Sequence, residues 1–220
     1  MARRKTFRKE GYLEFPNCFN RESEASWRTY LPENKPLILE LGCGKADFSY
    51  EMATKHPERN FIGVDLKPDR LWYPAKQALD NGVGNIAFLH IHLNELHEKI
   101  AEGEADELWV TFPDPFPKNR HAKHRMINTS FLKIYQQVLR PGGKVHFKTD
   151  NLPLFQFGLE VFVREGNIRF HALSFDLHED EHIGADAKVL TAYERKFMEM
   201  GLKINYVCFS FAAPAGGVTS

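Results

Sequence analysis

The feature that most constrains the fold of this chain is a glycine-containing turn between an apolar segment and a helix-like segment. Residues 37–39 are apolar, residues 40–44 read ELGCG, and an amphipathic stretch begins at Asp47. Glycines in this place let the backbone turn tightly and approach a ligand, as they do where the first strand of a doubly wound fold meets its helix. The turn therefore predicts a mostly parallel sheet with helices on both faces and a nucleotide-like ligand at the turn.

The remainder of the chain alternates between strand-like and helix-like segments, which is the pattern of a parallel sheet with crossover helices. We expect strands at residues 37–39, 60–64, 86–89, 108–112, 144–148, 168–175 and 203–211. We expect helices at residues 47–56, 69–81, 131–139, 154–164 and 187–200. These segments define one α/β domain over residues 35–211, preceded by a basic arm and lead-in segment at 1–34 and followed by a tail at 212–220.

Composition limits the class of protein. The chain has 220 residues, of which 43% are hydrophobic and 26% charged, as expected for a globular domain. In its sequence, no apolar run approaches the roughly 18 residues that a membrane span requires. Cys18, Cys43 and Cys208 are too far apart for a metal-ligand motif and odd in number for a disulfide framework. We therefore expect a cytoplasmic protein with no membrane segment and no bound metal.

Charge is balanced overall but clustered locally. The formal net charge is zero, which by itself argues against a nucleic-acid-binding protein. Residues 1–9, however, contain five lysines and arginines and no acid, and residues 118–125 contain four, with two histidines and again no acid. Two such clusters can form one basic face for a phosphate backbone, the first as a flexible arm and the second as a platform. The alternative is a disordered tail and a solvated loop.

Two features of the turn indicate which nucleotide-like ligand it binds. Asp47 stands where a dinucleotide-binding turn has its third glycine, so a pyrophosphate is not the expected ligand. Glu40 ends the first strand, and Asp65 ends the second about 20 residues beyond the glycines, where an acid accepts hydrogen bonds from ribose hydroxyls. S-adenosylmethionine carries a sulfonium and an ammonium group, which a carboxylate such as Glu40 suits. We therefore predict S-adenosylmethionine as the cofactor, bound by Glu40, Gly42, Gly44 and Asp65; the alternative is a plain turn with two exposed acids.

The fourth predicted strand leads into a proline-rich loop, residues 112–117 (FPDPFP), at the same edge of the sheet. Its prolines restrict the backbone and hold Asp114 and Phe116 in place before any ligand binds. An aromatic ring beside a carboxylate suits a planar, polar heterocycle, which stacks on the ring and donates hydrogen bonds to the acid. The basic residues 118–125 follow directly and predict a nucleic-acid substrate. A rigid structural loop is the alternative.

At this loop the sequence resembles one family specifically. The segment 112–125 (FPDPFPKNRHAKHR) resembles the signature of the tRNA (guanine-N7)-methyltransferases of the bacterial single-chain type. Three other stretches resemble the same family: ELGCG at 40–44, FKTDN at 147–151 and TAYERKF at 191–197 with a glycine shortly after it. Their order and spacing agree over about residues 35–211.

The resemblance implies a Rossmann-like S-adenosylmethionine-dependent methyltransferase fold, with a mostly parallel seven-stranded sheet whose last strand is antiparallel. It also implies transfer of a methyl group to N7 of a guanine in the variable loop of tRNA. Asp114 is the implied catalytic residue, and it would line the cofactor site with Glu40 and Asp65. The residues implied to face the substrate guanine and its neighbours are Lys118, Asp150, Thr191, Tyr193 and Glu194, and Lys118, Arg120, Lys123 and Arg125 would hold the tRNA backbone.

The chain departs from the family pattern at two positions. The family usually has tryptophan where Phe116 stands, so the stacking face is kept and the indole N–H is lost. The family usually has an acid at the end of the third strand, near the adenine, where this chain has His92. We therefore expect His92 or Asn94 to make the adenine contact of the cofactor site.

Two other functions stay open. One is a methyltransferase for another RNA base or for a small heterocycle, although the basic segment disfavours the small molecule. The other is a catalytically silent tRNA-binding relative, which His92 favours and the intact acids disfavour. The sequence HEDEH at 178–182 matches the zinc-protease pattern, but its three consecutive acids and its position after a strand favour a solvated loop over a metal site.

Overall fold

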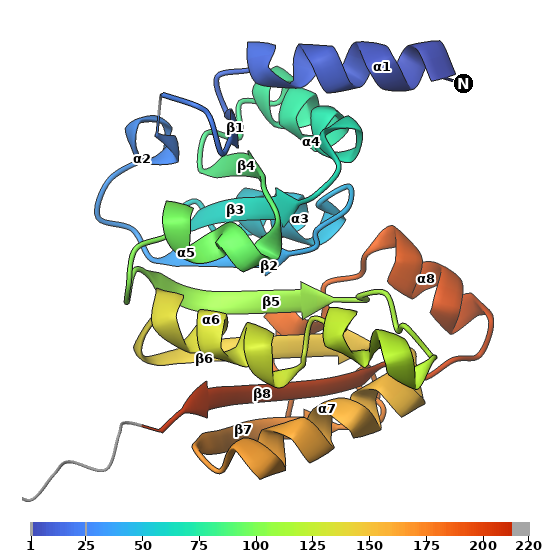
Figure 1. Ribbon diagram of the computed structural model, residues 1–220. Helices are drawn as coiled ribbons and strands as arrows, with labels where there is room; N and C mark the ends of the chain where they lie inside the picture. The colour runs from blue at the N-terminus through green and yellow to red at the C-terminus, as the bar shows by residue number, and fades with distance from the viewer. Residues whose placement is uncertain (1, 25, 213–220) are drawn as a thin grey trace, which may run out of the picture.

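The computed structural model describes residues 2–24 and 26–212, and within them eight strands form one sheet in the order β1-β4-β3-β2-β5-β6-β8-β7 (Figure 1). The strands are β1 (Cys18–Asn20), β2 (Leu37–Leu41), β3 (Asn60–Asp65), β4 (Ile86–His90), β5 (Ala105–Thr111), β6 (Leu139–Thr149), β7 (Ile168–Ser174) and β8 (Asn205–Phe211). The α-helices are α1 (Ala2–Gly11), α2 (Trp27–Tyr30), α3 (Asp47–Lys55), α4 (Pro68–Asp80), α5 (Leu96–Lys99), α6 (Thr129–Val138), α7 (Leu152–Glu165) and α8 (Ala192–Glu199). Short 3-10 helices are η1 (Tyr12–Glu14), η2 (Leu93–Glu95), η3 (Asn119–His124) and η4 (Ala185–Lys188).

Strand pairing confirms the predicted fold class. β4, β3, β2, β5 and β6 pair in parallel, and β8 inserts antiparallel between β6 and β7. β2 and β3 are buried along their whole length, which explains their continuous apolar sequences. The strand that we did not predict, β1, is three residues long and pairs in parallel with β4 at the sheet edge. A strand of three residues is too short to give a periodic signal in the sequence.

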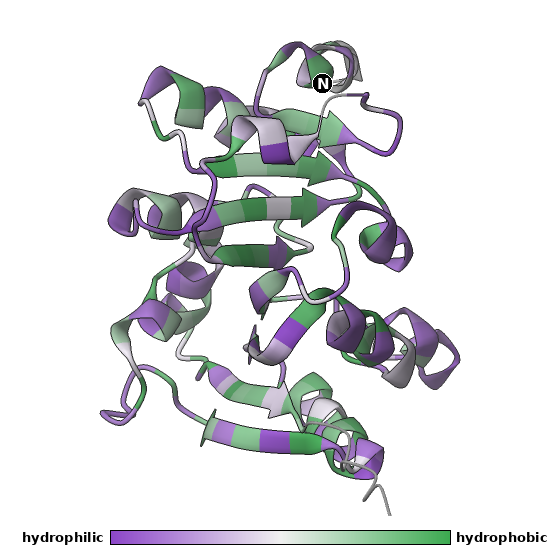
Figure 2. Ribbon diagram, turned by 90° about the vertical axis from the view of Figure 1, so that its left-hand side faces the viewer, coloured by the Kyte–Doolittle hydropathy of each residue, from purple (hydrophilic) through white to green (hydrophobic). Residues whose placement is uncertain are grey.

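Two apolar cores lie on opposite faces of the sheet. One packs beneath α2, α5, α6 and α7, with Tyr135 and Phe155 among its fully buried rings. The other packs beneath α3 and α4 and includes Phe48 and Leu71. Figure 2 shows the strands as mainly hydrophobic ribbons between helices that carry long hydrophilic stretches. Because helices cover both faces, the strand ends are left as the place for a ligand.

The N-terminal segment corrects one prediction. We expected a flexible basic arm, but Ala2–Gly11 forms helix α1, which packs against α4 (Figure 1). The Arg8 guanidinium lies 4.0 Å from the centre of the Tyr73 ring and 5.9 Å from that of Trp72, and it donates to the Tyr73 hydroxyl. Guanidinium groups stack readily on aromatic rings, so the aromatic side chains of α4 hold this segment in place.

Element boundaries differ from the predicted ones near the C-terminus. The helix expected over 187–200 is divided into η4 and α8, with irregular backbone between them. The Thr191 hydroxyl accepts from the Glu194 N–H at 3.1 Å, and the Glu194 carboxylate accepts from the Thr191 N–H at 3.3 Å. This capping box starts α8 at Ala192. Residues 213–220 of the predicted tail lie outside the described part of the chain.

Candidate active site

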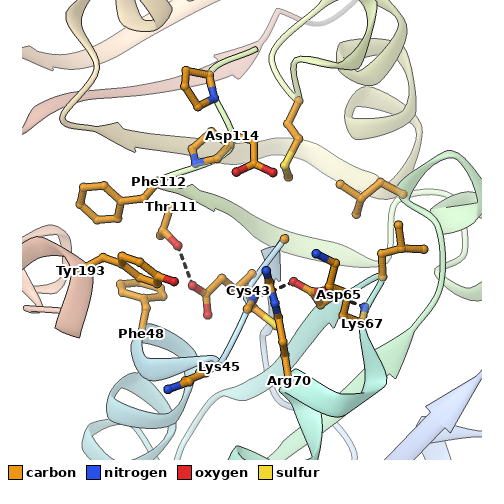
Figure 3. A pocket seen from close by; sticks show the side chains of 18 of the residues that line it. Cys43, Lys45, Phe48, Asp65, Lys67, Arg70, Thr111, Phe112, Asp114 and Tyr193 are labelled. Atoms are coloured by element: carbon orange, nitrogen blue, oxygen red, sulfur yellow. Dashed lines mark hydrogen bonds between the residues drawn. The ribbon is translucent and has the colours of Figure 1, made fainter. Parts of the chain in front are cut away.

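A pocket of about 810 Å³ opens at the carboxyl ends of the parallel strands (Figure 3). Its wall includes residues at or just beyond the ends of β2, β3, β4, β5 and β6 and residues around the start of α8. A doubly wound sheet binds its ligands at this edge, where the chain order reverses between β2 and β5. The predicted site residues that line the pocket are Glu40, Gly42, Gly44, Asp65, His92, Asn94, Asp114, Lys123, Asp150, Thr191 and Tyr193.

The glycine turn forms one part of the pocket wall. Gly42 and Gly44 have φ angles of 69° and 60°, in the left-handed region that favours glycine, and Ala46 follows at 53°. These residues turn the chain from β2 into α3. The Gly44 N–H donates to the Asp65 carboxylate at 2.8 Å, so the turn is tied to the end of β3.

Cys43 packs the turn against the sheet. Its side chain is buried beside Gly63 of β3, where an added Cβ would lie 3.0 Å from the Cys43 sulfur. Burial raises the pKa of the Cys43 thiol well above its usual value, and the carboxylates of Glu40 and Asp65 add to the effect. A thiol that stays protonated is a poor nucleophile, so Cys43 serves here as a small packing residue.

Glu40 lies at the pocket floor and is almost fully buried. One carboxylate oxygen accepts from the Ser49 N–H at 3.1 Å and from the Ser49 hydroxyl at 2.6 Å, and the other accepts from the Thr111 hydroxyl at 2.6 Å. Burial raises the pKa of Glu40 to about 7, although the hydrogen bonds favour the ionised form. The carboxyl is thus balanced between its two protonation states near neutral pH, and a cation beside it would favour the ionised one.

Asp65 is held by backbone donors on both of its oxygens. They accept from the Gly44 and Lys67 N–H groups, each at 2.8 Å. Each carboxylate oxygen has a second lone pair, so Asp65 can still accept two hydroxyl protons. This geometry is compatible with the predicted contact to a ribose. Figure 3 shows Asp65 beside Arg70, which also lines the pocket.

The proline loop enters the pocket through two strained residues. Phe112 and Phe116 have φ angles of 49° and 43°, a region that residues other than glycine rarely adopt and that costs about 1–3 kcal/mol. The Phe112 N–H donates to the Lys148 carbonyl at 2.9 Å, which anchors the loop to β6. Asp114 lies between the two bends, and its carboxylate points into the pocket (Figure 3). Backbone strain of this kind persists only where the surrounding structure stabilises it. Here the two strained residues flank Asp114 and direct its carboxylate into the pocket.

His92 and Asn94 lie beyond the end of β4 and line the pocket, where we expected the adenine contact. Both side chains are exposed. Leu66, Ile91 and Leu93 contribute apolar side chains to the same pocket. Apolar lining with a few polar groups beside it is the usual form of a site for a flat heterocycle.

The basic segment is divided between the surface and the interior. Lys123 and His124 line the pocket. Lys118 and Arg120 precede them by a few residues in the chain and are exposed. Arg125 is a correction, because it is only 8% exposed. Its guanidinium donates to two carbonyls of the proline loop at 3.0–3.3 Å and lies over an aromatic ring of α7. Arg125 therefore supports the proline loop from inside and leaves little of its side chain exposed for a tRNA backbone.

Glu194 is a second correction, because its side chain is fully buried. The carboxylate accepts from Lys148 Nζ at 2.8 Å, and its other oxygen lies 2.8 Å from His178 Nε2. Glu194 thus supports the start of α8 and is not among the residues that line the pocket, whereas Thr191 and Tyr193 of the same segment line it. We did not predict Lys148 as a site residue, although a lysine in a strand with buried neighbours was a signal for it.

The zinc-protease-like sequence at 178–182 lies in the loop between β7 and η4, as predicted. His178 is turned toward Glu194, and His182 is exposed. Within residues 2–24 and 26–212, no three His, Cys, Asp or Glu side chains are grouped as a metal site. The same described ranges contain no helix that is long and apolar enough to cross a bilayer.

Comparison with known proteins agrees with this geometry. Residues 34–207 match a family model described as "Putative methyltransferase". The tRNA (guanine-N(7)-)-methyltransferase of Cytophaga hutchinsonii is 36% identical over 218 residues, which cover 96% of this chain and 99% of that protein. A protein of the same name from Lactococcus lactis is 38% identical over 81% of each chain.

Solved structures share the fold at lower sequence identity. The antibiotic-resistance methyltransferase Kmr superposes with a TM-score of 0.61 at 16% identity, over 88% of this chain and 97% of that one. The 16S rRNA methyltransferase KamB superposes with a TM-score of 0.64 at 16% identity, over 87% of this chain and 94% of that one. These structures establish the fold, and the closer sequence relatives establish that the chain belongs to the tRNA (guanine-N7)-methyltransferase family.

Proposed function

We propose that this protein transfers a methyl group from S-adenosylmethionine to N7 of a guanine in the variable loop of tRNA. The observation that carries the proposal is that one pocket contains two sets of acids: Glu40 and Asp65 beside the glycine turn, and Asp114 and Asp150 beyond the ends of β5 and β6. A cofactor at the first set and a base at the second would be neighbours. The names of the relatives support tRNA as the substrate and guanine N7 as the position.

The size of the pocket and the acids in its wall support S-adenosylmethionine as the cofactor. Its volume of about 810 Å³ lies in the roughly 300–1,000 Å³ range of small-molecule sites. Glu40 and Asp65 would hold the ammonium end and the ribose, and Gly42 and Gly44 let the backbone come close. The adenine would lie against the apolar lining beside His92. When bound, the cofactor supplies a methyl group bonded to a positively charged sulfur.

The reaction needs orientation more than proton transfer. Guanine N7 carries an in-plane lone pair and no proton, so no general base is required. The protein must hold N7 in line with the methyl–sulfur bond and exclude water. Methylation gives the purine positive charge, which the carboxylates of Asp114 and Asp150 can stabilise. Burial raises the pKa of Asp150, and a cationic purine beside it would favour its ionised form.

The substrate base is stacked in folded tRNA, so it must be extruded into the pocket. Tyr193 is 60% exposed, lines the pocket and stacks on Phe197, so it offers an aromatic face to an extruded base. Lys118, Arg120 and Lys123 lie in the loop that follows Asp114 in the chain and offer contacts to phosphates. With tRNA as the substrate, we expect methyl transfer to take place in the cytoplasm.

The test is to incubate the purified protein with methyl-labelled S-adenosylmethionine and bulk tRNA and then to map the labelled nucleoside. Label in 7-methylguanosine supports the proposal. A tRNA transcript with adenosine in place of the variable-loop guanine is the control and should take up no label. Label in another nucleoside would assign a different RNA base to this pocket, and tRNA binding without label would indicate a silent relative.

A further inference from the structure

Lys148 is a fully buried lysine on β6 whose ammonium group is completely hydrogen-bonded. Its Nζ donates to the Ala187 carbonyl at 2.8 Å, to the Val189 carbonyl at 3.1 Å and to the Glu194 carboxylate at 2.8 Å. An ammonium group has three donors, so these three acceptors use its whole capacity. Lys148 therefore has no donor left for a ligand.

The three acceptors belong to one short segment, residues 187–194, which runs from η4 into the first turn of α8. The backbone has no regular structure at 189–191, and Leu190 and Tyr193 are 37% and 60% exposed. Ala187 and Val189 of the same segment are buried, and buried carbonyls need a hydrogen-bond partner. The Lys148 ammonium group is the hydrogen-bond donor to two of these carbonyls, those of Ala187 and Val189.

A second part of the pocket wall, the proline loop, depends on the same residue. The Lys148 carbonyl accepts the Phe112 N–H at 2.9 Å, at the bend that starts the proline loop with Asp114. The Lys148 ammonium lies 5.8 Å from the centre of the Phe112 ring, and Asp150 follows Lys148 by two residues. Three separate stretches of the pocket wall are therefore joined at one side chain and its backbone.

Charge completes the connection between Lys148 and α8. Burial lowers the pKa of Lys148, and the ion pair with Glu194 opposes that change. The other oxygen of Glu194 faces His178, and the capping box joins Glu194 to Thr191. A buried charge of this kind is sensitive to the loss of its partner, because the remaining charge would be left in a medium of low dielectric.

We propose that Lys148 is a positioning residue for the substrate-binding segment. Its ammonium group fixes residues 187–194 against β6, so that Thr191 and Tyr193 face the pocket, and its carbonyl holds the loop that carries Asp114. The inference rests on the proposed function for the identity of the substrate. The inference that Lys148 fixes the segment rests on the observed contacts of Lys148 and does not depend on the identity of the substrate.

The test uses Lys148→Met, which keeps an apolar side chain of similar length and removes the ammonium group. We expect faster amide hydrogen exchange at 187–194, and unchanged exchange in the glycine turn at 40–44. Lys148 also interacts electrostatically with Glu40, so we expect the dissociation constant for S-adenosylmethionine, measured by calorimetry, to change far less than kcat/KM for tRNA. We expect kcat/KM for tRNA to fall on the order of 100-fold, the loss that a displacement of about 1 Å in a binding group can cause.

Two further variants make the test specific. Glu194→Gln keeps an oxygen that accepts from Thr191 and removes the charge that pairs with Lys148, so it should give a smaller change in the same segment and in the same direction. Lys76→Met is the control, because it removes an exposed lysine that pairs with Asp80 at 2.7 Å on α4. The control should match the wild type in every measurement.

Either of two results would overturn the inference. Wild-type exchange at 187–194 in folded Lys148→Met would show that the segment does not depend on Lys148. Equal loss of cofactor and tRNA binding would show that Lys148 supports the whole fold. If Lys148→Met does not fold, Glu194→Gln decides by the same readouts. Hydrogen exchange needs no substrate, so a wild-type protein that fails to methylate tRNA would contradict only the proposed function.

Discussion

Replacing Glu40 with glutamine should remove a pH dependence from the stability of the protein. Burial raises the pKa of Glu40 from an ordinary 4.5 to about 7, so between these pH values the folded state keeps a proton that the unfolded chain has lost. Stability falls with rising pH wherever the folded state binds more protons, so this group costs stability progressively from about pH 4.5 to about pH 7. At about 1.4 kcal/mol per pKa unit, the full cost is about 3 kcal/mol.

Glutamine at position 40 can make the hydrogen bonds that Glu40 makes, but its side chain does not titrate. Its oxygen can accept from both Ser49 donors, and its amide can donate to the Thr111 hydroxyl, which rotates to accept. Urea unfolding at intervals from pH 5 to pH 8 is the assay. Over that range the wild type should lose about 2–3 kcal/mol relative to the variant, and the loss should stop above about pH 7.

A matched control and a refuting result follow from the same titration. Glu51→Gln removes an exposed glutamate of α3 that pairs with Lys55, and it should leave the wild-type pH profile intact. Parallel profiles for wild type and Glu40→Gln between pH 5 and pH 8 would show that Glu40 is ionised throughout, and the reasoning from burial would be wrong. Binding of S-adenosylmethionine should strengthen in the wild type as pH rises toward 7, because its cationic groups favour the ionised carboxylate, and should lose this dependence in Glu40→Gln.

Three further outcomes are expected. Asp114→Ala should lower the single-turnover rate of methyl transfer far more than the affinity for S-adenosylmethionine, and a normal rate would remove Asp114 from the mechanism. Removal of residues 1–9 should weaken tRNA binding and flatten its salt dependence, because fewer phosphate contacts release fewer counterions; an unchanged salt slope would show that these cations do not touch tRNA. Tyr193→Ala should raise KM for tRNA about tenfold, since base stacking is worth about 1–3 kcal/mol, while Tyr193→Phe should resemble the wild type. Equal effects of the two Tyr193 variants would point to the hydroxyl in place of the ring.

The cofactor end of the pocket was predictable because its signals are local. Gly42 and Gly44 must adopt positive φ angles, and Glu40 and Asp65 end neighbouring parallel strands, so sequence position alone brings them to one edge of the sheet. The same logic placed Asp114 at the end of β5, which is also a direct neighbour of β2. Parallel strand ends converge whatever the rest of the chain does, and this is why these residues line one pocket.

The roles of the charged residues around the substrate end were not predictable in this way. Arg125 and Glu194 look like surface groups in the sequence, because their neighbours in the chain are basic or polar. Their burial depends on partners that the charge pattern does not show: the Arg125 guanidinium donates to the Pro115 and Phe116 carbonyls, and Glu194 pairs with Lys148, 46 residues away. A pattern of charges along the chain does not report such partners, so it did not distinguish Arg125 and Glu194 from the exposed charges around them, and it predicted a flexible arm where Ala2–Gly11 forms a helix.

Glu40 and Glu194 are two buried acids with different roles. Glu40 accepts hydrogen bonds from the neutral donors of Ser49 and Thr111, and burial leaves it close to half-protonated near neutral pH. A cationic ligand beside Glu40 would therefore change its charge, and the change would appear in binding and its pH dependence. Glu194 is already paired with Lys148, so the same ligand would gain little from it. Loss of charge at Glu40 should alter ligand affinity, whereas loss of charge at Glu194 should alter the geometry of the segment that carries Tyr193.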